Sequence, residues 1–232
     1  MSFRQIKSWC WLFVTLLTMP YSLQAQQAEV PLTPISVQLN WHHQFNFAGF
    51  YAALQQGYYR DAGLDVTLKT WKPGIKVLDE VVSSRADFCI GYSSMAVDFA
   101  KGAPIRLVMS SFQYSPIVLL AHQPLQKLSE FSGKMVMHSD NLQIQGLLNK
   151  AKIEIHTPIV EVPSSGNLQD FIDHKVDFYA AYMTNEPYRL QQQNVPFYIV
   201  DPKSFGVQSY GDLVITSQTL ATQNPRAVEA FR

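Results

Sequence analysis

Three short stretches of the chain combine polar and aromatic residues that could bind a small, flat ligand. The first, 39–51, follows an apolar run and contains Trp41. An indole ring can stack on an aromatic ligand, with a gain of about 1 kcal/mol beyond burial. The second, 182–187, carries Asn185 and Glu186 directly before a proline. The third, 91–94, joins an apolar run to a helical one, where free N–H groups and the Ser93 hydroxyl could bind an anion or a carbonyl oxygen.

The carboxylate of Glu186 gives the most specific chemistry of the three. A carboxylate can accept two parallel hydrogen bonds, one from an exocyclic amine and one from a neighbouring ring N–H. An aminopyrimidine with a protonated ring nitrogen offers that pair of donors. Each residue also has a structural alternative: Trp41 as a core side chain, Ser93 as a helix cap, and Glu186 as an acid at a helix start.

Further polar residues extend the candidate ligand site. Tyr210 and Asp212 lie where the chain is expected to cross back between the two units, and both are candidates for lining the same cleft. The residues predicted to bind the ligand are Trp41, Tyr51, Ser93, Gln113, Tyr182, Asn185, Glu186 and Tyr210. We expect no catalytic residue, no cofactor and no metal, because the six histidines are scattered and show no zinc-site spacing. His42 and His43 are adjacent, so their side chains point apart.

Short β-type runs alternate with helical segments from residue 35 onward. The first unit reads as strands at 35–39, 64–69, 87–91 and 105–112, with helices at 47–60, 75–84 and 93–101. We expect Gly63 to end the first helix and a serine to cap the third. This order predicts an α/β fold with mainly parallel sheets and helices on both faces.

A second unit begins near Pro116 and repeats the rhythm. Strands are expected at 117–121, 134–138, 176–181, 197–200 and 213–216, and helices at 141–150 and 168–174. Asn224 and Pro225 start a last helix. We predict two lobes, 33–113 with 212–232 and 114–211, with a ligand cleft at the strand ends. The alternative is one continuous sheet without a cleft. Since the chain stops inside a helix, we expect a longer protein and an incomplete first lobe.

The N-terminus points to export. Residues 1–25 carry Arg4 and Lys7, then an apolar run, and are predicted to be a signal peptide cleaved near Ala25. The run is shorter than the roughly 20 residues that span a bilayer, which favours a cleaved peptide over the alternative of an uncleaved anchor. Cys10 falls inside this peptide, and Cys89 is expected to be a buried thiol without a disulfide partner.

The overall composition gives no sign of a partner that is recognised by net charge. The 232 residues include 18 Lys and Arg against 18 Asp and Glu, and 47% are hydrophobic. Such a chain is too apolar for disorder, and a net charge of zero supplies no basic field for nucleic acid.

An ordered set of motifs resembles a known family. These are Asn40-Trp41, Phe47-Ala-Gly-Phe-Tyr51, Gly57-Tyr-Tyr59, Ala62-Gly-Leu-Asp-Val66, Arg85-Ala-Asp-Phe88 with Gly91, Ala100-Lys-Gly102 and Asn185-Glu-Pro187. Together they resemble thiamine-precursor-binding proteins and thiamine pyrimidine synthases, from about residue 35 to the end. The resemblance implies a bilobal type II periplasmic-binding-protein fold. It also implies that Trp41 and cleft tyrosines sandwich a pyrimidine, while Glu186 binds its amino edge.

The synthase branch of that family is the less favoured reading. It uses a lysine that holds pyridoxal phosphate, with a histidine four residues later, and 91–100 contains neither residue type. Its cysteine-rich iron motif has no counterpart at 206–211. Export also conflicts with cytosolic cofactor chemistry. We therefore expect a non-enzymatic, periplasmic, monomeric receptor for an aminopyrimidine-like heterocycle.

Two kinds of partner remain open. One is the permease of an ABC importer, and the other is the signalling module of a histidine kinase or diguanylate cyclase. Residues 42–45 and 112–116 are similar to the sensor-associated subgroup of the family. A transmembrane span beyond residue 232 would establish the sensor, and a stop codon after one or two more helices would favour the importer.

Overall fold

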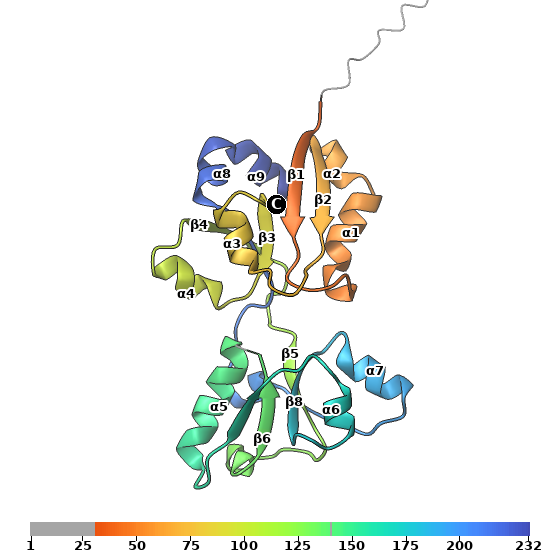
Figure 1. Cartoon of the computed structure of the whole chain (residues 1–232), viewed down its shortest axis with the longest axis vertical. Coiled ribbons are helices and arrows are strands. Elements are labelled where there is room, and N and C mark those ends of the chain that lie inside the picture. The colour runs from red at the N-terminus through yellow and green to blue at the C-terminus, as the bar shows by residue number, and fades with distance from the viewer. Residues whose placement is uncertain (1–30, 140) are drawn as a thin grey trace, which may run out of the picture. The chain divides into compact units, whose positions relative to one another are not determined.

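The computed structural model describes residues 31–139 and 141–232, and they form two five-stranded sheets flanked by helices (Figure 1). In the first sheet the order is β2-β1-β3-β10-β4, with β1 (Thr33–Gln38), β2 (Leu64–Lys69), β3 (Phe88–Gly91), β4 (Ile105–Ser110) and β10 (Leu213–Ser217). In the second it is β7-β6-β8-β5-β9, with β5 (Ile117–Ala121), β6 (Met135–His138), β7 (Val160–Pro163), β8 (Phe178–Tyr182) and β9 (Tyr198–Val200). The predicted signal peptide and Cys10 lie outside the described residues.

Strand direction is nearly uniform within each sheet. In the first sheet β1 pairs in parallel with β2 and β3, while β10 runs antiparallel to β3 and β4. In the second, β6 pairs in parallel with β7 and β8, while β5 runs antiparallel to β8 and β9. The α/β prediction is confirmed, with one reversed strand per sheet. That strand is the one through which the chain enters the sheet from the other, so it starts at the edge where its neighbours end.

Apolar side chains of the first sheet alternate between two faces. Phe88 and Ile90 belong to one buried cluster and Cys89 to another. On the first face lie α1 (Ala48–Gln55), α2 (Tyr58–Asp61) and α9 (Pro225–Phe231), and on the second lies α3 (Val77–Val82). The Phe231 ring stacks on Phe88 at a centroid distance of 4.3 Å. The expected buried thiol is confirmed, since Cys89 is fully buried and burial raises its pKa to about 12.

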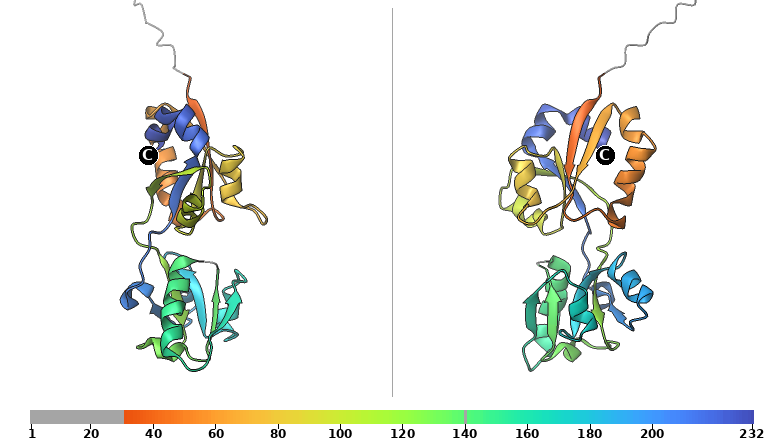
Figure 2. Two further views of the ribbon diagram at one scale, coloured as in Figure 1. Left: turned by 90° about the vertical axis from the view of Figure 1, so that its left-hand side faces the viewer. Right: turned by 45° about the vertical axis from the view of Figure 1, so that its right-hand side comes forward.

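The second sheet is built in the same way. Leu119 faces α5 (Leu142–Glu154), while Leu120 faces α6 (Gln169–Ile172) and α7 (Glu186–Gln192). Successive strand residues point to opposite faces, so helices on both sides are needed to bury them. Figure 2 shows helices on both faces of each sheet. The remaining helices are α4 (Met95–Ala100), α8 (Gln218–Gln223) and three 3-10 turns at Phe45–Phe47, Leu128–Phe131 and Pro202–Phe205. Among the described residues, none of these helices has the length and apolar character to cross a membrane.

Two local expectations needed correction, and two short elements were not expected. The helix predicted over 47–60 is broken at Gly57, whose φ of 78° lies in the left-handed region that ends a helix. The serine before α4 makes no side-chain cap, because Ser94 already has helical backbone angles. The sequence reading also missed β7 and α8. By contrast, Gly63 ends α2 and Asn224 caps α9, as predicted.

Two chain segments connect the sheets, and they pair with each other. Backbone hydrogen bonds join Ser115 N to Ser209 O and Gly211 N to Phe112 O, each at 2.9 Å. The outgoing and returning segments therefore form a short two-stranded ribbon.

Candidate functional site

A cavity of about 410 Å³ lies where strand ends of both sheets meet. Its lining from the first sheet follows β1 and β3 and consists of Asn40, Trp41, Gln44, Asn46 and Tyr92. Its lining from the second sheet lies at the start of β5, at the ends of β6, β7 and β8, and on α7: Ile117, Ser139, Asn141, Ser164, Gly166, Tyr179, Ala180, Ala181, Tyr182, Asn185, Glu186 and Arg189. The carboxyl ends of like-directed strands are where α/β sheets gather ligand contacts.

Trp41 presents an exposed ring at this cavity. Its ring stacks on Trp71 with centroids 4.9 Å apart, and 39% of the residue is exposed. Trp71 is itself held in place by donating from Nε1 to the Ile75 carbonyl at 3.0 Å. The alternative of Trp41 as a core residue is therefore wrong. Because Trp71 covers one side of the indole, a ligand could stack only on the other.

Asp212 connects the two sides of the cavity. Its carboxylate accepts hydrogen bonds from Asn40 Nδ2 and Asn46 Nδ2, each at 3.3 Å, and from Tyr182 Oη at 2.8 Å. Asp212 precedes β10 of the first sheet, whereas Tyr182 ends β8 of the second. One buried carboxylate thus joins groups from both sheets.

Burial shifts the pKa values of the ionisable groups in this cluster. It raises the pKa of Asp212, which is only 1% exposed, while the donors from Tyr182, Asn46 and Asn40 act in the opposite direction. Burial also raises the pKa of Tyr182 well above its usual range, and raises that of Tyr92 to about 12 with a contribution from the Asp212 charge. Both phenols are therefore neutral donors at physiological pH.

Glu186 is held by its own chain at the start of α7. Its Oε2 accepts from the Tyr182 backbone N–H and its Oε1 from Asn185 Nδ2, both at 2.8 Å. Asn185 Nδ2 also donates to Gln44 Oε1 at 3.3 Å, which joins the two sides a second time. The predicted alternative of an acid at a helix start and the predicted position in the cleft are both realised. Each oxygen keeps a lone pair that its protein partner does not use.

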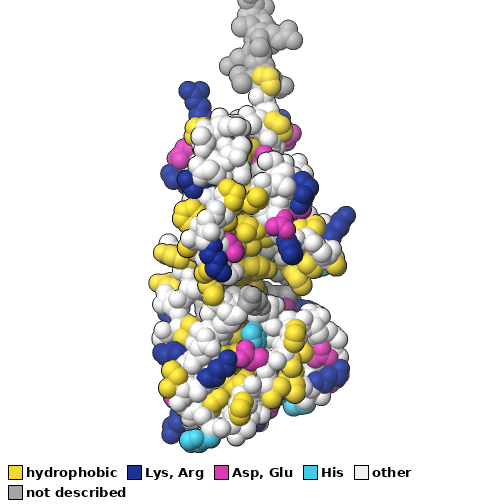
Figure 3. All heavy atoms as spheres, turned by 60° about the vertical axis from the view of Figure 1, so that its left-hand side comes forward, with side chains coloured by type: hydrophobic (Ala, Val, Ile, Leu, Met, Phe, Trp, Pro, Cys, Tyr) yellow, Lys and Arg dark blue, Asp and Glu magenta, His cyan; other side chains and the backbone are white. Residues whose placement is uncertain are grey.

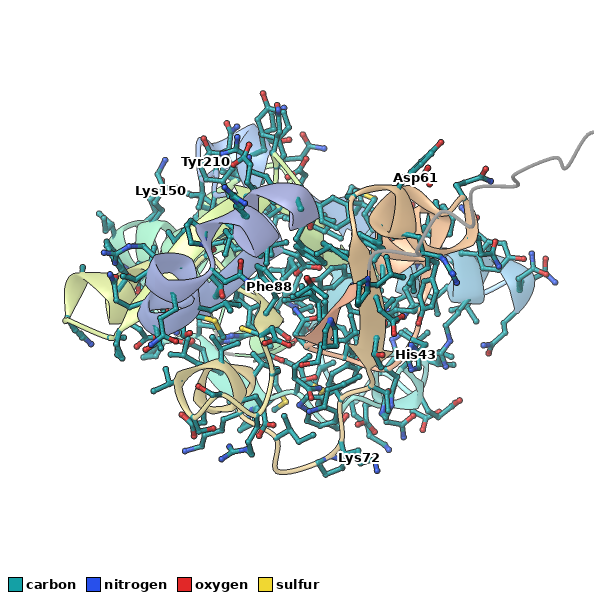
Figure 4. All side chains as sticks on the ribbon, turned by 90° about the horizontal axis from the view of Figure 1, so that it is seen from above. His43, Asp61, Lys72, Phe88, Lys150 and Tyr210 are labelled. Atoms are coloured by element: carbon teal, nitrogen blue, oxygen red, sulfur yellow. The ribbon has the colours of Figure 1, made fainter. Side chains whose placement is uncertain are left out.

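Four predicted site residues lie outside the cavity lining. Tyr51 is half-buried in α1 and hydrogen-bonds the His43 ring. Ser93 lies in the turn before α4, and Gln113 is exposed in the connecting ribbon. Tyr210 is 61% exposed, and Figure 4 shows it at the periphery of the view while Phe88 lies near the centre. Trp41, Tyr182, Asn185 and Glu186 are the predicted residues that the fold brings together.

Several residues that line the cavity were not predicted from the sequence. Tyr92 and Ser139 directly follow predicted strands, so their position at a strand end was the available signal. Ser164 follows β7, a strand whose short sequence gave no such signal. The sequence identifies Asn40 only as part of a motif. No local pattern predicts that Asn46 hydrogen-bonds the Asp212 carboxylate together with Asn40.

Two further features concern metal ligands and the distribution of surface charge. No group of three or more His, Cys, Asp or Glu side chains among the described residues could hold a metal ion. On the face shown in Figure 3, positive and negative side chains are scattered rather than separated by sign.

The comparison with protein families agrees with this architecture. A model of the family described as NMT1/THI5 like matches residues 44–232. The chain belongs to this family. A curated relative of the NMT1/THI5-like chain, the riboflavin-binding protein RibY of Chloroflexus aurantiacus, is 23% identical over 225 residues, which cover 91% of the chain and 63% of the relative. The chain therefore spans less than two thirds of that protein.

Solved structures share the fold of the NMT1/THI5-like chain. The periplasmic aliphatic sulphonate binding protein SsuA of Escherichia coli matches with a TM-score of 0.62 at 14% identity, over 87% of this chain and 66% of SsuA. An arginine-specific periplasmic binding protein of Salmonella typhimurium matches with a TM-score of 0.61 at 10% identity, over 85% and 91%. The chain thus has the bilobal periplasmic-binding-protein fold.

Proposed function

We propose that this protein is an exported, non-enzymatic binding protein that captures a small nitrogen heterocycle, most specifically a thiamine pyrimidine precursor. The observation that carries the proposal is the cavity between the two sheets, which brings Trp41, Tyr182 and Glu186 together. Its volume of about 410 Å³ is near the lower end of the range of ligand pockets, which favours a small ligand.

Each lining group has a role in this proposal. The free face of Trp41, together with the cavity tyrosines, stacks on the heterocycle. Glu186 accepts from the amino edge, using the lone pairs that Tyr182 N and Asn185 Nδ2 leave open. Asn185 and its neighbouring amides set the orientation of the ring. Tyr51, Ser93, Gln113 and Tyr210 remain candidates only if the ribbon or the lobes move on binding.

The mechanism is closure of two lobes on the ligand. We place the lobes at 33–113 with 212–232 and at 114–211, joined by the paired connecting segments. Closure excludes water and strengthens the polar contacts inside the cavity. The protein would act in the periplasm as a monomer and deliver its ligand to the permease of an ABC importer. The sensor of a histidine kinase or diguanylate cyclase would use the same cavity and closure.

A second ligand candidate comes from the curated relative. The name of RibY states that it binds riboflavin, another flat nitrogen heterocycle. Riboflavin would use the same stacking face, but it is larger than a pyrimidine.

A thermal-shift titration tests the function. The purified protein is titrated with 4-amino-5-hydroxymethyl-2-methylpyrimidine, its formylamino analogue, thiamine, riboflavin and pyridoxal phosphate. A ligand at 100 times its dissociation constant should add about 2.7 kcal/mol to the free energy of unfolding. We expect a shift with a pyrimidine. A shift with riboflavin alone would replace the pyrimidine assignment, and no shift with any of them from folded protein would contradict the proposed function.

A further inference from the structure

Two buried amide groups in the cavity have an acceptor without a partner. Asn40 and Asn46 are 4% and 9% exposed, and both line the cavity. The Oδ1 atom of each is buried and makes no hydrogen bond with any described residue. Buried polar atoms in folded proteins nearly always have a partner, so two such oxygens on residues that line one cavity call for an explanation.

Asp212 explains why these oxygens are left open. An ionised carboxylate only accepts hydrogen bonds, so the nitrogen of each amide must face it. The nitrogens do so at 3.3 Å, and turning either amide would set its oxygen against a carboxylate oxygen. Asp212 is itself fixed, because Tyr182 Oη donates to its side chain at 2.8 Å and Ser111 N donates to its backbone carbonyl at 2.9 Å. Both Asn oxygens are therefore left as acceptors without a hydrogen-bond partner among the described residues.

We propose that Asn40 Oδ1 and Asn46 Oδ1 accept hydrogen bonds from an N–H or O–H group on a substituent of the bound heterocycle, with Asp212 as the positioning residue. This assignment rests on the proposed function and adds a second requirement on the ligand. The amino edge meets Glu186 on the second sheet, and a hydroxyl or amine substituent meets the amide pair on the first.

The same arrangement excludes a class of ligands at this position. Sulphonate and carboxylate groups carry only acceptors, so they would face two amide oxygens and a nearby carboxylate with nothing to donate. A ligand without a donor here would leave two buried acceptors unpaired, which is how polar sites reject close analogues. The amide pair therefore determines specificity for a donor-bearing substituent.

Three pyrimidines that differ only at the substituent test this assignment. All keep the 4-amino-2-methylpyrimidine ring, and the 5-substituent is hydroxymethyl, aminomethyl or ethyl. The ethyl group matches hydroxymethyl in size and has no donor. By isothermal titration calorimetry, we expect the unaltered protein to bind the hydroxymethyl and aminomethyl compounds at least about tenfold more tightly than the ethyl compound.

Matched variants assign the preference to the amide pair. Asn46→Leu should bring the ratio of the hydroxymethyl and ethyl affinities close to one, because it removes an acceptor at similar size. Asp212→Asn should reduce the ratio as well, since the amides are no longer held in one orientation. Asn149→Leu, on the exposed face of α5, should leave the ratio unchanged.

Each outcome decides one of the two proposals. Equal affinity of the unaltered protein for the hydroxymethyl and ethyl compounds would overturn the donor requirement and leave the pyrimidine function standing. A preference that survives in folded Asn46→Leu would overturn the assignment to the amides in the same way. Failure of all three compounds to bind would overturn the pyrimidine function and, with it, this inference. The comparison of ligands on the unaltered protein needs no variant to fold.

Discussion

Glu186 is bound from both sides by its own chain, and this determines how it could serve a ligand. Its two oxygens accept from Tyr182 N and Asn185 Nδ2, so the carboxylate is fixed before any ligand arrives. A preorganised acceptor loses little conformational entropy on binding. A glutamine at this position would turn an NH2 group toward one of two donors. Both the charge and the local hydrogen bonding would then be lost.

We expect Glu186→Gln to weaken binding of an aminopyrimidine far more than Trp41→Phe does. Loss of a charged hydrogen-bond partner corresponds to about 1.5–3 kcal/mol, whereas exchanging one stacking ring for another changes about 1 kcal/mol or less. Calorimetric titration of both variants measures the difference. Glu154→Gln, at the exposed end of α5, is the matched control. Equal losses at Glu186 and Trp41 would refute the carboxylate pairing.

At the scale of elements, side chains at the ends of helices and strands form the lining of the cavity. Asn141 caps α5, with Oδ1 accepting from the backbone N–H of Gln143 at 3.0 Å and of Ile144 at 3.2 Å. The cap satisfies two backbone N–H donors that have no partner within the helix. Asn141 itself is only 8% exposed. The same residue lines the cavity, so the start of the helix and the site are set together.

Replacing this cap should cost stability. We expect Asn141→Ala to lower the free energy of unfolding by about 1 kcal/mol, the usual effect of losing a side-chain cap. Urea denaturation followed by circular dichroism measures it. Asn149→Ala, inside the same helix and exposed, should be neutral or slightly stabilising because alanine is the better helix former. A variant at position 141 as stable as the parent would show that the cap contributes nothing.

A second element-scale feature is the stack of rings beside β8. His122 stacks on Phe171 at 4.1 Å and on His174 at 3.9 Å, and its Nε2 hydrogen-bonds the Val176 carbonyl at 3.2 Å. Burial, followed by the charge of His174, lowers the pKa of His122 from 6.5, against smaller opposing contributions from Val176 and Asp177. The folded state therefore favours the neutral ring.

This stack should make stability depend on pH. With the folded pKa below the unfolded one, the His122 contribution is fully present above about pH 6.5 and is lost as the pH falls toward the folded value. We expect the parent to lose stability across that window relative to His122→Phe. Urea denaturation at a series of pH values from 7.5 downward gives both curves. Parallel curves would contradict the lowered pKa.

At the scale of the whole molecule, the paired connecting segments carry the chain between the two sheets. Gly211 donates to the Phe112 carbonyl within this ribbon. A Cβ at Gly211 would lie 2.6 Å from Phe112 Cβ and 3.0 Å from Pro116 Cδ, closer than ordinary van der Waals contact. The close approach of the two segments, rather than a special φ angle, requires glycine at this position.

A methyl group at Gly211 should disturb the ribbon. We expect Gly211→Ala to lower the free energy of unfolding by about 1–3 kcal/mol, as for other overpacked sites. Chemical denaturation measures the loss. Gly49→Ala is the matched control, because a Cβ there has no atom within 4 Å and the exposed residue lies in α1. The ribbon argument fails if the two variants behave alike.

The sequence by itself determined the elements and much of the fold. Apolar runs marked most strands, Gly63 and Asn224 marked helix ends, and the alternation of strands and helices gave the α/β class. These signals are local, because they depend on backbone conformations and side-chain periods that a few neighbouring residues set. Local signals did not predict the break at Gly57, because α1 and α2 together resemble one longer helix. They also did not predict the short strand β7.

Tertiary structure decided which polar residues meet. Trp41, Tyr182, Asn185 and Glu186 could be predicted because each lies at or just after the end of a strand, and the cavity gathers strand ends of both sheets. Nothing local showed that Asp212 would be buried against Asn40, Asn46 and Tyr182, since this depends on the reversed strand β10 bringing a distant segment back between the sheets. Sequence patterns report conformation along the chain, whereas the partners of this buried carboxylate depend on contacts between residues 30 to 172 positions apart.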